Sequence, residues 1–146
     1  IIGANFSFEY IITNALRTRH DLTITTGKDS DKIPLRHVPP TFGSSHLIYE
    51  NQKLYFNIYV DYSEKLSYNQ LAPDEQDKPH IYLPDDNGNP YSPSWFTLNL
   101  KTNYKLKKNI TLGAGIENIL DNRYRTYSSG IVSPGINAMA SVLYHF

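Results

Sequence analysis

Apolar and polar residues alternate along most of this chain of 146 residues, and this alternation limits what the chain can fold into. In the segment 54–63, the even positions hold Leu54, Phe56, Ile58, Val60 and Tyr62, with polar residues or tyrosines between them. Successive side chains of a β-strand point to opposite faces, so a period of two predicts strands with one apolar and one polar face. The pattern predicts seven strands and no helix, at residues 2–12, 16–25, 42–50, 54–63, 96–106, 110–117 and 138–146. The expected fold class is therefore all-β, as an antiparallel meander of about seven strands.

Short and long connections alternate between these strands. Residues 13–15, 51–52 and 107–109 form the short connections, whereas residues 27–41, 65–93 and 121–135 form long, polar, proline-containing loops. All three long loops therefore leave the same end of the sheet. Loops of this length are uncommon in compact soluble domains, but outer-membrane barrels combine short turns at one end with long loops at the other. At the turn 51–52, we expect Glu50 to lie opposite Lys53 as an ion pair.

The aromatic and charged residues give a second indication of a membrane barrel. Aromatic side chains of the apolar face fall into two groups, near the short turns (Tyr10, Tyr49, Phe56, Tyr104, Tyr144 and Phe146) and near the long loops (Tyr62 and Phe96). Two such belts are typical of the two interfaces of a membrane. The charged residues fall on the opposite face, where they avoid a cost of roughly 2–4 kcal/mol for each Lys or Arg at the membrane midplane. A soluble β-sandwich also alternates, but it explains neither the belts nor the one-sided loops.

Composition excludes several classes of function. The formal net charge is zero, from 14 basic and 14 acidic residues, which disfavours a nucleic-acid binder. Cysteine is absent, and the five histidines show no metal-ligand spacing. The residues Asp85-Asp86-Asn87-Gly88-Asn89 do not fit the spacing of an EF-hand and favour a turn. No catalytic triad is recognisable, so we expect no enzymatic activity, no metal and no cofactor.

From Trp95 onward, the sequence carries an ordered set of motifs. A strand runs into Glu117-Asn118-Ile119-Leu120-Asp121, which is followed by Tyr124, by Pro134-Gly135 and by a last strand that ends in Phe146. In this order the motifs resemble the C-terminal end of TonB-dependent outer-membrane receptors. The segment 36–40 (Arg-His-Val-Pro-Pro) resembles an upstream element of the same barrels. The family usually has arginine after Pro-Gly, where this sequence has Ile136, so a polar contact of that arginine is not carried over.

The resemblance implies a barrel of 22 strands, with an N-terminal plug in its lumen, in the outer membrane of a Gram-negative bacterium. Such receptors import scarce ligands (siderophores, haem, cobalamin or glycans), energised by a TonB-type protein that acts through the plug. Residues 1–146 are then expected to be a C-terminal fragment without the plug and the N-terminal strands. The absence of an initiator methionine and of a signal peptide agrees with this expectation. Seven strands could not close an antiparallel barrel, and an open sheet would leave unsatisfied edges in lipid.

Two sets of residues are candidates for binding. Tyr68, Tyr82 and Tyr91 lie in the longest loop, where tyrosines can contact a ligand or a surface partner over a large area. Val142, Tyr144 and Phe146 of the last strand resemble the signal read by the outer-membrane assembly machinery, which pairs along an exposed strand edge. The remaining expected partners are outer-membrane lipid and the plug. The alternative function is a soluble all-β binding module that uses its long loops for recognition.

Overall fold

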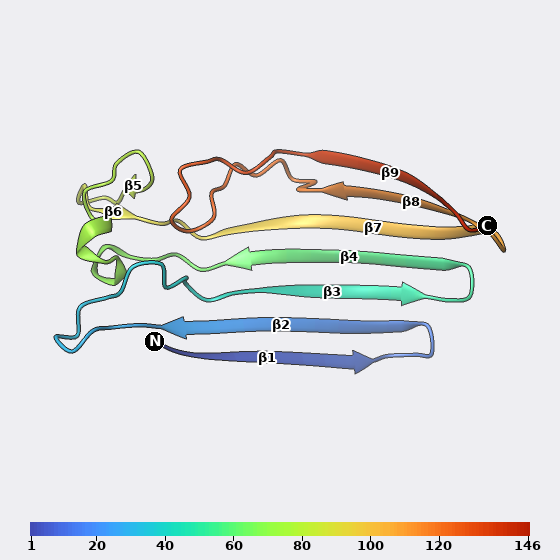
Figure 1. Cartoon of the computed structure of the whole chain (residues 1–146), viewed down its shortest axis with the longest axis horizontal. Helices are drawn as coiled ribbons and strands as arrows, with labels where there is room; N and C mark the ends of the chain where they lie inside the picture. Colours follow the sequence, from blue (N-terminus) through green and yellow to red (C-terminus); the bar gives the residue numbers. More distant parts are fainter.

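The computed structural model describes all residues, 1–146, and forms one antiparallel sheet whose strands follow chain order (Figure 1). The sheet contains β1 (Ile2–Ile11), β2 (Leu16–Thr26), β3 (Phe42–Glu50), β4 (Leu54–Ser63), β7 (Trp95–Lys107), β8 (Ile110–Glu117) and β9 (Asn137–Tyr144). The predicted seven-stranded meander is confirmed. The last strand ends at Tyr144, before the predicted limit, since Phe146 lies beyond the ladder.

The connections lie at opposite ends of the sheet. Figure 1 shows the short turns and the C-terminus at one end, and the long loops at the other. We call residues 27–41 the first loop, 64–94 the second loop and 118–136 the third loop. The second loop contains two 3₁₀ turns, η1 (Tyr68–Gln70) and η2 (Pro73–Glu75), and a small hairpin of β5 (Leu83–Pro84) and β6 (Pro90–Tyr91). None of the helical turns has the length or the apolar run that crossing a membrane would need.

The register keeps the apolar faces of neighbouring strands in phase. One row across the sheet pairs Phe6 with Leu22, Leu22 with Gly43, Gly43 with Tyr62, and Tyr62 with Phe96. Because directly paired residues point to the same side, the period of two found in each strand becomes one continuous apolar face. Gly43 is required within this row, since a Cβ there would collide with the backbone oxygen of Asp21 and with the ring of Tyr62.

The sheet is a single layer, and its apolar face is uncovered. Phe6, Tyr10 and Phe96 are 58%, 59% and 49% exposed, whereas Thr97 and Asn99, on the other face, are each 3% exposed. This distribution inverts that of a soluble domain, whose apolar face would be packed against a second layer. The sandwich alternative requires such a layer, and the chain supplies none (Figure 1).

The polar face carries a network of paired side chains. Its cross-strand ion pairs join Arg17 to Glu50 at 2.9 Å and Lys101 to Glu117 at 3.1 Å, and Arg19 pairs with Asp21 of the same strand at 3.2 Å. The amide of Asn99 donates to Asp61 at 3.1 Å, and His46 stacks on Tyr59 with ring centroids 5.0 Å apart. The charged residues therefore satisfy one another on the face opposite the apolar one, as predicted.

The prediction of an ion pair between Glu50 and Lys53 is wrong. The turn between β3 and β4 has three residues, and the side-chain oxygen of Asn51 accepts the backbone N–H groups of Lys53 and Leu54, each at 2.9 Å. Glu50 consequently pairs with Tyr55 in the ladder, and its carboxylate binds Arg17 of β2 instead.

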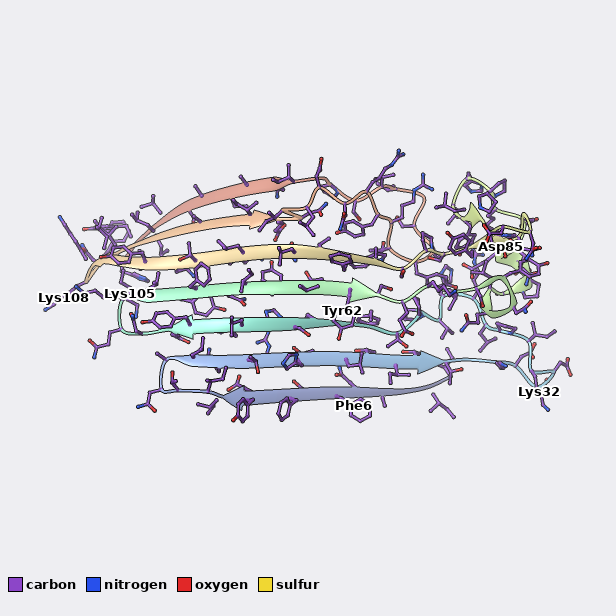
Figure 2. The ribbon with its side chains drawn as sticks, turned by 180° about the vertical axis from the view of Figure 1, so that it is seen from behind. Phe6, Lys32, Tyr62, Asp85, Lys105 and Lys108 are labelled. Carbon is purple, nitrogen blue, oxygen red and sulfur yellow. The ribbon has the colours of Figure 1, made fainter.

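The side-chain view in Figure 2 shows the two ends of the sheet. Lys105 and Lys108 lie at the end with the short turns, and Lys32 and Asp85 lie at the end with the long loops.

Candidate functional site

The three long loops meet at one buried carboxylate, that of Glu75 in η2. Its side chain is 0% exposed although it lies in a polar surface loop. It accepts hydrogen bonds from the hydroxyl of Tyr82 at 2.9 Å, of Tyr127 at 2.5 Å and of Ser128 at 3.0 Å. We call these four residues the Glu75 cluster. The donors come from the second and third loops, so the cluster joins two segments that are far apart in the sequence.

The first loop reaches the same cluster through Arg36 and His37. The Nε atom of Arg36 lies 4.0 Å from the Glu75 carboxylate, and His37 Nδ1 lies 3.4 Å from the hydroxyl of Ser128. His37 and Ser128 have φ values of 62° and 60°, a left-handed conformation that is uncommon outside glycine. Such strain persists only where the surroundings hold it in place, which indicates that the loops support one another here.

Apolar packing and one arginine strengthen the junction of the second and third loops. Leu66, Leu71 and Tyr82 form a small buried cluster, against which Ile81 and Tyr127 pack. Arg125 of the third loop donates from Nη1 to the backbone oxygens of His80 at 2.8 Å and Ile81 at 3.3 Å. The second and third loops therefore pack against each other around a small core of their own, and we call these two loops together the loop unit.

The electrostatics of the cluster favour an ionised Glu75. Burial alone would raise the pKa of Glu75, but hydrogen bonds from Tyr127, Tyr82 and Ser128 and the nearby His37 outweigh burial and lower this pKa. Burial, followed by the hydrogen bond to Glu75, raises the pKa values of Tyr82 and Tyr127 above the ordinary tyrosine range. Both tyrosines therefore remain protonated donors to a charged acceptor, the stronger class of hydrogen bond.

The family motif forms a second junction, between the ends of β8 and β9. Asn118 is 3% exposed with φ 51°, and its backbone N–H donates to the side chain of Asn99 at 2.8 Å. Its amide nitrogen donates to the backbone oxygens of Asn122 at 2.9 Å and Pro134 at 3.2 Å. Asn118 thus ties both ends of the third loop to β7, so its role in this structure is architectural.

The other motif residues surround this junction. A carboxylate oxygen of Asp121 accepts the backbone N–H of Ile136 at 3.0 Å, and a Cβ at Gly135 would collide with the same oxygen. The ring of Tyr124 packs on Trp95 with centroids 4.4 Å apart, and Glu117 pairs with Lys101. Ile136, which replaces the family's arginine, contributes this backbone donor and leaves its side chain 59% exposed.

The three tyrosines predicted to contact a ligand differ in their burial. Tyr82 is 3% exposed, and its hydroxyl is bonded to Glu75, so it lies inside the loop unit rather than on its surface. Tyr68 in η1 and Tyr91 in β6 are half-buried. The segment 85–89 between β5 and β6 is the predicted turn, where Asp85 accepts two backbone N–H groups and Gly88 has φ 82°.

Sequence reasoning missed the residues that join the loops and line the space between them. A pocket of about 340 Å³ lies between the second and third loops, with Arg123 and Arg125 in its wall. Arg123-Tyr124-Arg125 was visible as an alternation of charge and aromatic ring within the motif region. No sequence signal distinguishes Glu75 from its neighbours Asp74 and Gln76.

Nowhere in the chain do three or more histidine, aspartate or glutamate side chains form a group that could hold a metal ion.

The proposed assembly signal lies at the free edge of the sheet. Val142 and Tyr144 belong to the apolar face of β9, are 73% and 50% exposed, and pair only with β8. The rings of Tyr144 and Phe146 meet edge to face, with centroids 5.1 Å apart. The backbone N–H of His145 donates to Asn109, which fixes the end of the chain beside the short turn.

A single-layer antiparallel meander with short turns at one end and long loops at the other is the arrangement of strands found in outer-membrane β-barrels. The chain belongs to the family described as TonB dependent receptor-like, beta-barrel, whose model matches residues 1–119. As this is a family of receptors and transporters, the expectation that the protein is not an enzyme is confirmed. No curated protein matched the sequence.

Several solved receptors share the fold. The copper transporter OprC superposes with a TM-score of 0.82 at 21% identity, over 99% of this chain and 22% of its own. The ferric enterobactin receptor PfeA from Pseudomonas aeruginosa gives a TM-score of 0.73 at 17% identity, over 99% and 22%. The siderophore receptor PirA from Acinetobacter baumannii gives 0.71 at 19% identity, over 99% and 22%. The chain thus spans about a fifth of the length of these receptors.

Proposed function

We propose that this chain is the C-terminal barrel portion of a receptor that imports a scarce ligand across the outer membrane of a Gram-negative bacterium. The observation that carries the proposal is a sheet with an uncovered apolar face, whose three long loops meet at one end around the Glu75 cluster. In a barrel, these loops would stand outside the membrane above the lumen and be available to a ligand.

The polar face supports the remaining partners of the proposal. Its rows of paired charges and amides would line the lumen and face the N-terminal plug of the full-length chain. The uncovered apolar face would contact outer-membrane lipid, and the two free edges, along β1 and β9, would pair with strands from the rest of the barrel. A TonB-type protein would supply energy through the plug, and the assembly machinery would read β9.

The ligand class of the proposal is that of a siderophore, haem, cobalamin or a glycan. Among the structural neighbours, one is named a copper transporter and others are named ferric enterobactin or siderophore receptors. Tyr68 and Tyr91 are the proposed ligand contacts of the second loop, since they are half-buried rather than enclosed.

The test is growth of the organism with and without the full-length gene, in media limiting in turn for iron, copper, haem or cobalamin, and in media with a glycan as the sole carbon source. We expect a defect in one medium, restored by the intact gene but not by a gene whose product lacks the TonB-contacting segment. Restoration without that segment would contradict energised import. Tyr68→Ala with Tyr91→Ala should raise the ligand concentration needed for half-maximal uptake several-fold, because each lost tyrosine removes contact area of order 100 Å².

A further inference from the structure

Positive charge gathers at the end of the sheet that carries the short turns. Residues 12–15, 51–53 and 105–109 contain no aspartate or glutamate and hold four exposed lysines, Lys53, Lys105, Lys107 and Lys108. None of these lysines takes part in the five ion pairs of the chain, and the two carboxylates near this end, Glu9 and Glu50, both bind Arg17. The three long loops, by contrast, hold nine of the 14 acidic residues. The formal net charge of zero therefore conceals an uncompensated basic end.

Two of the lysines lie directly opposite each other on the polar face. The backbone N–H of Lys105 donates to the backbone oxygen of Lys53 at 2.8 Å, one position beyond the ladder pair of Leu54 and Tyr104. Like charges in such a position repel each other, and the structure places no carboxylate against them. The basic end is thus held together against its own repulsion, which an external anion would relieve.

A bulge brings a third lysine to the apolar face. Regular alternation along β7 would leave Lys107 on the polar face with Lys105, but the register shift between them pairs Lys107 with Ile110. Directly paired residues point to the same side of a sheet, and Ile110 pairs in turn with Tyr144 of the apolar face. The side chain of Lys107 therefore shares a row with an apolar and an aromatic residue.

The surroundings of Lys107 are those of a membrane interface. Tyr104 and Tyr144 lie at the same end of the apolar face, both exposed, and Phe146 meets Tyr144 edge to face. Lys108 follows at the tip of the turn between β7 and β8 (Figure 2). A lysine at such a place can lay its aliphatic stem along apolar surface while its ammonium reaches the level of the lipid headgroups, where aromatic rings also prefer to lie.

We propose that Lys107 and Lys108 bind the phosphate of an anionic phospholipid, in the membrane leaflet on the side of the short turns, with Tyr104 and Tyr144 beside its headgroup. The lipid supplies the negative charge that this end of the sheet lacks. A lipid is favoured over an acidic protein because Lys107 is continuous with the face that the proposed barrel turns towards lipid. The inference rests on the proposed membrane barrel, but it is independent of the ligand that the receptor imports.

The test places a fluorophore on a single cysteine, Leu106→Cys, in the full-length receptor without other reactive thiols, reconstituted in phosphatidylcholine bilayers. The probes are phosphatidylglycerol and phosphatidylcholine that carry the same nitroxide-labelled chain, which quenches the fluorophore when the lipid lies beside it. We expect labelled phosphatidylglycerol to reach half-maximal quenching at a mole fraction about fivefold lower than labelled phosphatidylcholine. This preference should decrease at high salt, because salt screens the attraction between the lysines and the phosphate.

Two double variants separate the faces of the basic end. Lys107→Gln with Lys108→Gln should remove most of the preference, and replacement of the same two residues by arginine should keep it. Lys53→Gln with Lys105→Gln is the matched control, since it removes two positive charges from the same end but on the polar face, and it should leave most of the preference intact. Thermal unfolding of each variant shows whether the substitutions disturb the fold.

Equal quenching by the two lipids, or a preference that does not change with salt, would overturn the inference without any substitution. It would also be overturned by an unchanged preference in the Lys107 and Lys108 variant. A preference that depends on Lys53 and Lys105 instead would assign the basic end to an anionic partner on the polar face. Absence of ligand uptake by a receptor that retains the lipid preference would contradict the proposed import alone.

Discussion

At the scale of single residues, Glu75 is the most demanding position in the chain. Its carboxylate is fully buried, which is costly unless the charge is compensated, and three hydroxyl donors from two loops supply the compensation. The same bonds hold the left-handed backbone of Ser128 in place, next to His37 of the first loop. This one side chain is therefore contacted from all three loops, in addition to the apolar packing and the Arg125 hydrogen bonds that join the second and third loops.

Replacing Glu75 by Gln keeps the shape of the side chain but removes its charge. The tyrosine hydroxyls would then donate to a neutral acceptor, so we expect the loop unit to lose about 1–3 kcal/mol of local stability. Hydrogen exchange in the second and third loops of the full-length receptor measures this loss. Asp74→Asn is the matched control, because Asp74 is the exposed neighbour of Glu75 and should leave exchange unchanged.

The same position predicts a dependence on pH. The pKa of Glu75 is lowered in the folded loops, so its contribution to stability is complete above its ordinary value of 4.5 and is lost as the pH falls through the lowered pKa. The protection of the loop amides, measured as the exchange rate relative to the intrinsic rate of an unfolded amide at the same pH, should therefore decrease in acid below this ordinary value. In Glu75→Gln this part of the decrease should be missing, and an identical profile of protection against pH in the variant would show that another group is responsible.

At the scale of elements, the strands were predictable and the junctions between loops were not. Each strand has a face that must remain apolar, so the period of two marks its extent, as in β3 and β4, whose limits agree with prediction. The loop residues follow no period, and their partners are distant in sequence: Glu75 meets Tyr127 across 52 positions. Tyr82 was recognised as a loop aromatic, but its burial depends on this meeting and could not be inferred locally.

Errors at the ends of elements have local causes. The Asn51 side chain binds two backbone N–H groups and lengthens the turn, which moves Lys53 away from Glu50. Between β7 and β8 the register shifts between Lys105 and Lys107, an irregularity of the kind that is common at strand ends. The motif of Asn118 and Asp121 was recognised by its resemblance to a family, whereas its function as a tie between β7, β8 and β9 required the structure.

The third loop offers a matched pair of glycines for testing the β8–β9 junction. A Cβ at Gly135 would collide with the Asp121 carboxylate, whereas a Cβ at Gly130 has nothing within 4 Å. Gly135→Ala should therefore displace Asp121, break its bond to Ile136 and destabilise the receptor by about 1–3 kcal/mol. Gly130→Ala should change stability by less than about 0.5 kcal/mol. Thermal unfolding of the two full-length variants compares them. Equal effects would contradict a stabilising role of Asp121 at the junction between β8 and β9.

The last strand is the element with a second expected role. Deleting Phe146 from the full-length protein removes the ring that meets Tyr144 at the edge of the sheet. We expect the deletion to reduce insertion into the outer membrane more than it reduces expression. The measurement is the fraction of the expressed receptor that is recovered in the outer membrane. Phe146→Trp keeps an aromatic ring and should insert normally. Normal insertion of the deletion variant would refute the assembly role of β9.

At the scale of the whole molecule, the single-layer sheet has two surfaces that are stable only in different environments. One surface is apolar with aromatic rings towards both ends, and the other is a network of ion pairs and amides. The free edges along β1 and β9 leave backbone groups that need partners, in lipid above all. Both features follow if the sheet is part of a closed barrel with lipid outside and a polar lumen inside.

The most direct test of this account asks which face of β7 meets lipid. The chain contains no cysteine, so single cysteines can be placed at Leu98, Asn99, Leu100 and Lys101 of the full-length receptor, in a background free of other reactive thiols, and spin-labelled in bilayers. A lipid-soluble relaxation agent should affect the labels at Leu98 and Leu100 several-fold more than those at Asn99 and Lys101, because the side chains alternate between faces. Equal effects at all four positions, or a stronger effect at Asn99 and Lys101, would contradict the assignment of the apolar face to lipid.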